Sequence, residues 1–405
     1  MTTDFERRTR PTSLPIPVQS IEPRPWSFRK TLRGVREYPA AVPISLMELE
    51  ISVPPEMDER LRDTALMIAA AEASAPVSLS ALEPFLVRTE AIASSRIEDE
   101  RTTVDQLARA EAGVRVSAKT RTVYAAALAL QKLVNASGQE ITLDSILAAH
   151  KSLMEGDAAE QFHAGRLRDM QNWIGGLGAH PVGADYVPPH PSRVADGIED
   201  LIAFAAARGI DPIVQAALVH AQFEAIHPFT DGNGRIGRAL INTVLRARGV
   251  TKTLLVPVAA ALAADQTRYF ASLEQFHLGD AGPIVGVVVD SLRLSTSEMA
   301  RSSELLAELP EIWREAAKPR RGSAAARLID RLLTEPVVDP DEIQARLQIS
   351  EATAYRTIGA LEEAGVLRRL GQSRRDSLWG ASAVLDEADN LLERVQEEVA
   401  LGRWV

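Results

Sequence analysis

One segment near the middle of the chain combines residue types that bind phosphate and move a proton: His227-Pro228-Phe229-Thr230-Asp231-Gly232-Asn233-Gly234-Arg235-Ile236-Gly237-Arg238. Its two loop glycines let a ligand approach the main chain. Because the segment runs into a predicted helix, free N–H groups and the helix dipole create an anion site there. Arg235 and Arg238 are three residues apart on the first turn, so both can bond further phosphate oxygens. The segment is therefore predicted to bind several phosphates.

Two other side chains of the segment add chemistry to this anion site. Asp231 is a hard oxygen ligand of the kind that holds Mg²⁺ together with substrate phosphates. His227 can accept a hydroxyl proton near neutral pH. A lone histidine at a helix end is usually structural, and a lone Gly-x-Gly is usually a turn. Their coincidence in one loop favours a functional site, and the spacing of the seven histidines does not suggest a histidine-ligated metal.

Two helices are expected to position this segment. Asp211 as N-cap and Pro212 in the first turn begin a helix that runs to His227. A second helix starts beyond Gly234 and ends before Gly249. Upstream, the Gly- and Pro-rich run 175–192 excludes a helix, and Tyr186-Val187 could form a strand within it. We expect a hairpin or flap there.

The segment HPFTDGNGRIGR resembles the signature of Fic-domain proteins, HxFx(D/E)GNGRxxR, at every position. The resemblance implies a mainly α fold, with a helical core carrying this loop under a β-hairpin flap that contains Tyr186 and Val187. It also implies transfer of AMP from ATP with Mg²⁺ to a Tyr, Thr or Ser hydroxyl of a protein target, including the chain itself. The related Doc kinases carry Lys at the position of Gly234, so glycine here favours nucleotidyl transfer.

Residue roles follow from the same resemblance. His227 would be the base, Asp231 would hold Mg²⁺, and Phe229 would anchor the loop. Phosphate contacts would come from Gly232, Asn233, Gly234 and Arg235, and Arg238 would pair with the γ-phosphate.

A second segment, Ile92 to Asp99, places Ser94 and Glu98 on the helical stripe begun by Val87 and Ala91. It resembles the inhibitory motif (S/T)xxxE(G/N) of Fic proteins, which implies that Glu98 pairs with Arg238 and blocks the γ-phosphate. Asp99 departs from the motif's Gly or Asn. One hypothesis from this motif is that Glu98 inhibits the chain's own activity. The other is that Glu98 orients a water that removes AMP, which would make the enzyme bifunctional or mainly a hydrolase.

Residues 323–380 follow a helix–helix–helix–strand–strand pattern that resembles a bacterial winged helix-turn-helix domain, a small α+β fold. Residues 319–380 contain ten Arg and nine Asp or Glu, so this segment has a net charge of +1, although the whole chain has a net charge of −10. The predicted DNA contacts lie near the third helix (Thr353, Tyr355, Arg356 and Thr357) and in the wing (Arg374 and Arg375). Binding to DNA and binding to a protein remain alternatives. A DNA-binding regulator with a nucleotide-sensing Fic core is the competing function.

Length and composition set the frame for these motifs. The 405 residues suffice for two or three domains, and 46% hydrophobic with 25% charged residues is typical of a globular protein. The absence of cysteine excludes thiol chemistry, and the lack of a signal peptide or a long apolar run predicts a cytoplasmic protein without a membrane partner. Monomer and homodimer both remain open. The expected parts are a Pro-rich extended arm (1–45), a helical region with the inhibitory helix (46–115), the Fic core (116–300), a linker (301–322), the winged helix (323–380) and a terminal helix (381–405).

Overall fold

The computed structural model is mainly helical, as expected, with 61% of the chain in helices. The residues it describes are 13–28, 35–75, 79–136, 140–157, 160–176, 180–371 and 377–404. Over those ranges, each helix is too short or too polar to cross a membrane.

Two compact units make up the chain, and each is assembled from separated segments. The first contains Met1–Leu66, Leu128–Val250 and Asp265–Asp290, and the second contains Met67–Ala127, Thr251–Ala264 and Ser291–Val405. Helices α2 (Pro55–Ser74), α5 (Ala118–Ala136) and α12 (Gly282–Ala317) contribute residues to both. The domain boundaries expected from the sequence stay predictions.

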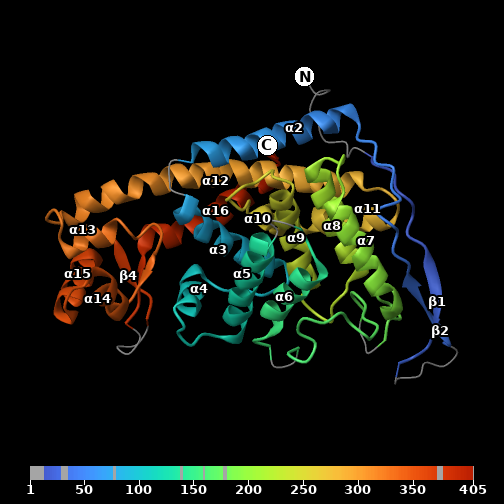
Figure 1. Ribbon diagram of the computed structural model, residues 1–405, viewed down its shortest axis with the longest axis horizontal. Helices are drawn as coiled ribbons and strands as arrows, with labels where there is room; N and C mark the ends of the chain where they lie inside the picture. Colours follow the sequence, from blue (N-terminus) through green and yellow to red (C-terminus); the bar gives the residue numbers. More distant parts are fainter. Residues whose placement is uncertain are drawn as a thin grey trace. The chain divides into compact units, whose positions relative to one another are not determined.

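The first unit is centred on α8 (Pro212–Ile226), which packs along α9 (Asn233–Ala247) (Figure 1). Thirteen of the fifteen residues of α8 are buried. Helices α7 (Val194–Ala206) and α11 (Gln266–His277) also pack on α8, and α6 (Leu143–Met154) packs on α9. The loop between α8 and α9 is therefore held by the core of its unit.

The predicted bounds of α8 and the predicted end of α9 are confirmed, whereas α9 begins at Asn233 and not beyond Gly234 as expected. Oδ1 of Asp211 accepts hydrogen bonds from the N–H groups of Ile213 (2.8 Å) and Val214 (3.2 Å), which caps α8. At the other end of the pair, Gly249 has a φ of 75° and follows the last turn of α9. Glycine adopts this left-handed backbone at little cost, so the chain leaves the helix there.

The Pro-rich arm contains a strand pair that we did not predict. Strand β1 (Ile21–Pro25) pairs antiparallel with β2 (Glu37–Ala41), and Ile21 lies opposite Ala41. Tyr38 and Ala40 of β2 are buried. Two prolines in β1 are compatible with an edge strand, where a missing N–H costs no ladder bond.

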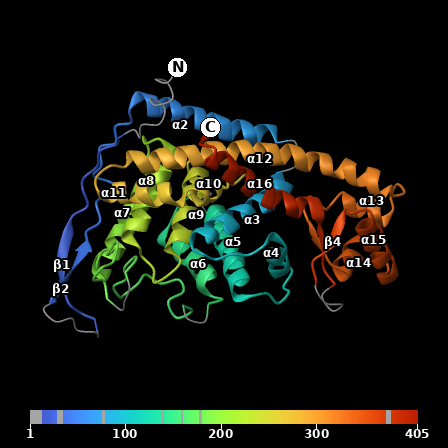
Figure 2. The same ribbon diagram turned by 180° about the vertical axis from the view of Figure 1, so that it is seen from behind.

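The second unit is built around α3 (Leu79–Ile97), which packs on α10 (Val258–Ala264) and α16 (Ser382–Ala400) (Figure 2). Glu90 of α3 is 1% exposed, and its carboxylate accepts the N–H of Ala259 at the start of α10 (2.8 Å). A buried carboxylate needs such a donor. Helix α4 (Val104–Glu111) also packs on α3 and α16.

The C-terminal part of this unit has the elements expected of a winged helix. Helices α13 (Ala324–Ile329), α14 (Pro340–Leu347) and α15 (Glu351–Glu363) are followed by β4 (Leu367–Arg369) and β5 (Trp379–Ala381). A short strand, β3 (Val337–Val338), completes a sheet of order β3-β5-β4 and was not predicted. Residues 301–317 of the predicted linker continue α12 as a helix.

Within the second unit, the root of the wing is attached to α4 and α16. Arg368 of β4 forms an ion pair with Asp105 of α4 (2.6 Å) and another with Asp386 of α16. Arg109 of α4, only 8% exposed, donates from Nη1 to the carbonyl of Leu370 (2.8 Å). The wing strands thus contact the helices around α3.

The cap of α8 can be tested by mutation. Asp211→Ala should lower the free energy of unfolding by about 1 kcal/mol, because two first-turn N–H groups lose their acceptor. Asp211→Asn keeps a capping oxygen and should cost much less. Urea unfolding followed by circular dichroism measures both, and equal losses in the two variants would contradict this role.

Candidate functional site

The connection between α8 and α9 begins at His227, which has left-handed backbone angles (φ 49°, ψ 61°). Its N–H still bonds to the carbonyl of Phe223 (2.9 Å). Left-handed angles are uncommon for a residue other than glycine. His227 therefore ends α8 and turns the chain into the loop.

The loop is closed by the side chain of Asn233. Its Oδ1 accepts the N–H of Phe229 (2.8 Å), and its Nδ2 donates to the carbonyl of Phe229 (2.9 Å). The Phe229 side chain is fully buried, as expected for an anchor. Since the Asn233 amide makes both bonds within the loop, the structure uses this side chain to shape it. A phosphate contact by Asn233 stays a prediction.

His150 of α6 supports the loop from behind, and sequence analysis did not single it out. Its ring stacks on Phe229 with centroids 3.7 Å apart. Nδ1 accepts the N–H of Gly165 (3.0 Å), so Nε2 carries the proton and donates to the carbonyl of Asp231 (3.1 Å). Burial lowers the pKa of His150 to about 4, which keeps the ring neutral. Only the tertiary contact between α6 and the loop reveals this role.

Helix α9 then starts with the geometry expected of an anion site. Its first internal hydrogen bond runs from Ile236 N–H to the carbonyl of Gly232 (3.1 Å), so the N–H groups of residues 233–235 have no partner within the helix. The N–H of Gly232 donates to Oδ1 of Asp231 (2.5 Å). Gly232 has a φ of 77°. Positive charge from the helix dipole is concentrated at this end.

Two charged side chains flank this helix end. The Asp231 carboxylate is 52% exposed and accepts from Nη2 of Arg235 at 3.5 Å, whereas the Arg235 side chain is 6% exposed. Within the described ranges, no group of three or more His, Asp or Glu is placed to hold a metal ion. A single accessible carboxylate beside a predicted phosphate site does fit Mg²⁺, which takes most of its ligands from phosphate and water.

Arg238 lies deeper in the fold, with 1% of its surface exposed. Burial and, secondarily, the charge of Arg238 lower the pKa of His220 to about 3. His220 Nε2 is 2.9 Å from the hydroxyl of Tyr269. Arg235 and Arg238 both project from the first turns of α9, but only small parts of either reach the surface.

The predicted flap is a minimal hairpin within the described residues. Ile174 and Tyr186 form an antiparallel bridge, and residues 177–179 of the predicted flap lie outside the described residues. The Tyr186 hydroxyl donates to the carbonyl of Ala225 (2.9 Å), and its ring stacks on His277 at 4.2 Å. The Tyr186 side chain thus anchors the hairpin to α8. The contact of Tyr186 and Val187 with a target chain stays a prediction.

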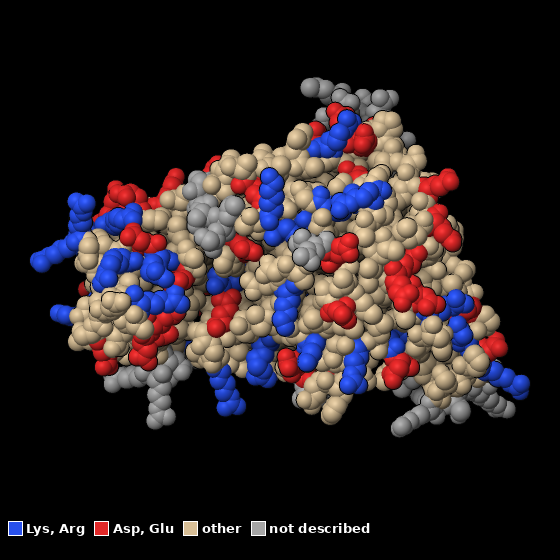
Figure 3. Space-filling model, viewed as in Figure 1, with Lys and Arg blue, Asp and Glu red and all other residues tan. Residues whose placement is uncertain are grey.

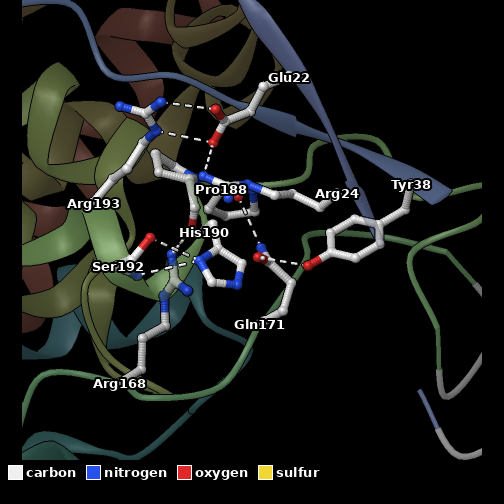
Figure 4. Close-up of polar contacts among 10 residues, drawn as sticks. Glu22, Arg24, Tyr38, Arg168, Gln171, Pro188, His190, Ser192 and Arg193 are labelled. Atoms are coloured by element: carbon white, nitrogen blue, oxygen red, sulfur yellow. Dashed lines mark hydrogen bonds and ion pairs between the residues drawn. The ribbon is translucent and has the colours of Figure 1, made fainter. Parts of the chain in front are cut away.

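Arg168 is a second residue that sequence analysis missed. It is 4% exposed and donates from Nε to the carbonyl of His227 (2.8 Å). Its Nη2 donates to the carbonyl of Pro189 (2.5 Å), which follows the flap. Figure 4 shows Arg168 among polar residues from the arm, the flap and the short 3-10 helix Pro191–Arg193 that precedes α7. A lone arginine in a loop carries no sequence signal for such a role.

The two predicted inhibitory residues belong to the second unit. Ser94 is buried in α3, whereas Glu98 is exposed and comes directly after α3, which ends at Ile97. Asp99 has a φ of 57°, so the chain turns sharply there. We expected Glu98 to continue the helical stripe, but it lies just past the helix end. Its pairing with Arg238 stays a prediction.

The predicted DNA contacts differ in their exposure to solvent. Thr353 is half-buried, Tyr355 and Arg356 are exposed, and Thr357 is buried. Arg374 and Arg375 lie outside the described residues. Figure 3 shows Lys and Arg intermixed with Asp and Glu over α13–α15, without one dominant sign. DNA binding stays a prediction.

Comparison with known proteins supports the domain type. Residues 140–245 match the Fic/DOC family, so this part of the chain is a Fic/DOC family domain. Protein adenylyltransferase fic-1 of Caenorhabditis elegans is 34% identical over 156 residues, covering 38% of this chain and 28% of the relative. Protein adenylyltransferase Fic of Nematostella vectensis is 30% identical over 153 residues, covering 37% and 32%. The chain thus spans less than a third of the length of these curated relatives.

The fold comparison covers more of the chain. A Fic family protein from Desulfovibrio desulfuricans G20 aligns with 82% of this chain and 97% of its own, with a TM-score of 0.52 and 22% sequence identity. At this identity the similarity concerns the fold alone.

The close packing of α6 against Gly232, at the start of α9, can be tested with a matched control. A Cβ on Gly232 would lie 2.6 Å from Cε of Met154 and 2.8 Å from Cδ2 of Leu153, whereas a Cβ on Gly249 would meet nothing within 4 Å. Both glycines have left-handed φ, which costs other residues about 1–2 kcal/mol. Gly232→Ala should therefore destabilise the fold more than Gly249→Ala in urea unfolding. Equal destabilisation would contradict the close packing of α6 on the loop.

Proposed function

We propose that the chain transfers AMP from ATP to a hydroxyl group of a protein. The observation that carries this proposal is the loop between α8 and α9, where the N-terminus of α9 meets Asp231, Arg235 and the left-handed His227. These groups have the chemistry that nucleotidyl transfer requires: anion binding, a metal ligand and a base.

In the proposed reaction, His227 accepts the proton of the target hydroxyl as its oxygen bonds to the α-phosphorus of ATP. The bond from that phosphorus to the oxygen bridging to the β-phosphate breaks, and pyrophosphate leaves. The first-turn N–H groups of α9 and Arg235 would neutralise phosphate charge. Mg²⁺, when bound through Asp231, would add to this neutralisation.

We further propose that the enzyme is autoinhibited through Glu98. Support comes from the inhibitory sequence motif and from Arg238, the proposed γ-phosphate partner, which has 1% of its surface exposed. A terminal phosphate would therefore reach Arg238 only after neighbouring groups move.

The central experiment tests the base. The full chain is incubated with α-labelled ATP, Mg²⁺ and a cell extract as the source of targets, and labelled protein is measured. His227→Ala should reduce labelling by about 10²–10⁴-fold, the usual contribution of a general base. His163→Ala, a histidine outside the loop, serves as the control. Labelling that persists in His227→Ala would refute the proposed base.

The same assay tests autoinhibition. Glu98→Gly should increase labelling by about 5–150-fold, the range given by common coupling free energies. Glu100→Gly makes the same change two residues further on and should leave labelling unchanged. Equal labelling of wild type and Glu98→Gly would exclude the inhibitory role. Release of AMP from a pre-labelled target by wild type, but not by Glu98→Gly, would favour AMP removal instead.

A further inference from the structure

The four residues Tyr186–Pro189, here called the flap limb, lead from the flap towards α7. Each of their carbonyl oxygens accepts a hydrogen bond, in order from Ile174 N–H (2.9 Å), Ala41 N–H (2.9 Å), Gln171 Nε2 (2.8 Å) and Arg168 Nη2 (2.5 Å). Pro188 and Pro189 have no N–H and cannot complete a strand ladder. Side-chain donors therefore hold the second half of the limb.

One of these donors, Arg168, also holds the end of α8. Besides its bond to Pro189, its guanidinium donates to the carbonyls of His227 (2.8 Å), Ile226 (3.3 Å) and Met170 (3.1 Å). Its main-chain N–H donates to the carbonyl of Pro228 (2.9 Å). The last carbonyls of a helix lack internal partners, and a cation at this end is favoured by the dipole.

The consequence concerns the direction of the His227 side chain. Left-handed angles are not the intrinsic preference of a histidine, so surrounding contacts must maintain them. The bonds from Arg168 to the His227 and Pro228 carbonyls fix the two peptide planes that follow its Cα. They therefore fix the direction of the Cα–Cβ bond from which the imidazole extends.

The arm supports the same assembly from the other side (Figure 4). The Tyr38 hydroxyl donates to Oε1 of Gln171 (3.4 Å), and Arg193 at the start of α7 makes two bonds to Glu22 of β1 (2.9 and 2.8 Å). The Arg193–Glu22 pair is partly exposed and contributes modestly. Arg168, which is buried, is the link between limb and histidine.

We propose that Arg168 is a positioning residue that sets the geometry of the base His227 and of the flap limb together. This inference rests on the proposed function of His227. It predicts that Arg168 governs the rate of transfer and not the binding of nucleotide, because the phosphate site at the start of α9 depends on other contacts.

The decisive variant is Arg168→Lys, which keeps the charge but loses the planar fork that reaches several carbonyls at once. In the Glu98→Gly background, kcat should fall by about 10²-fold, as for a misplaced catalytic group, with the KM for ATP within about twofold of the parent. In the His227→Ala background, Arg168→Lys should have no further effect on the residual rate. Unchanged kcat, a rise in KM for ATP alone, or additive losses would each overturn the proposal.

A readout independent of activity separates this inference from the proposed function. Hydrogen–deuterium exchange of Arg168→Lys should increase in both 186–190 and 224–230, while the rest of the first unit keeps its protection. Gln171→Met removes the donor to Pro188 together with the bonds of Gln171 to Asn172 and Tyr38, but none to the end of α8, so exchange should increase in 186–190 and not in 224–230. If Arg168→Lys fails to fold, Gln171→Met still tests the limb. Protection unchanged in 186–190 would then refute side-chain control of the limb. If no protein is labelled but hydrogen exchange changes as predicted, only the proposed reaction would be rejected.

Discussion

The candidate site depends on the reciprocal hydrogen bonds between Asn233 and the main chain of Phe229. These bonds close the short loop 227–232 between the end of α8 at Ile226 and the start of α9 at Asn233. A helix end normally has unpaired N–H groups that water satisfies, but here they are presented inside a shaped loop. The candidate anion site, the neighbouring carboxylate of Asp231 and the base candidate His227 therefore lie in one short segment of the chain.

Buried polar side chains hold that piece in place. His150 stacks on Phe229 and binds the carbonyl of Asp231, and Arg168 binds the carbonyl of His227. Both side chains are almost fully buried, and both donate hydrogen bonds to main-chain oxygens. Such bonds are worth most where water is excluded, because an unpaired buried polar group is costly. Side chains from α6 and from the segment before the flap thus hold the main chain that carries the proposed reacting groups.

The second unit joins the predicted inhibitory helix and the winged helix. Helix α3 packs on α16, and the wing strands are tied to α4 and α16 by Arg109 and Arg368. Of the expected DNA contacts that the structure describes, Tyr355 and Arg356 are exposed and Thr357 is buried, and charges of both signs lie over α13–α15 (Figure 3). Mixed charge reduces the electrostatic attraction that supplies most non-specific DNA affinity.

The sequence by itself determined the local features. Asp211 and Pro212 predicted the start of α8, and Gly249 predicted the end of α9, because caps and glycine act within a few residues. The residue pattern of 227–238 likewise predicted the loop between these helices, and the chemistry assigned to the loop stays a prediction. The sequence also predicted the three helices of the C-terminal part. It did not predict β3, because a strand of two residues shows too little periodicity.

Only the tertiary structure decided which distant residues support the site. The pairing of β1 with β2, the stacking of His150 on Phe229 and the contacts of Arg168 join segments separated by tens of residues. Neither a histidine in a helix nor an arginine in a loop signals its partner, because such contacts arise from the packing of α6, α8 and the flap. Local sequence rules describe bonds within a few residues, whereas the position of a side chain against another element depends on how the whole core is filled.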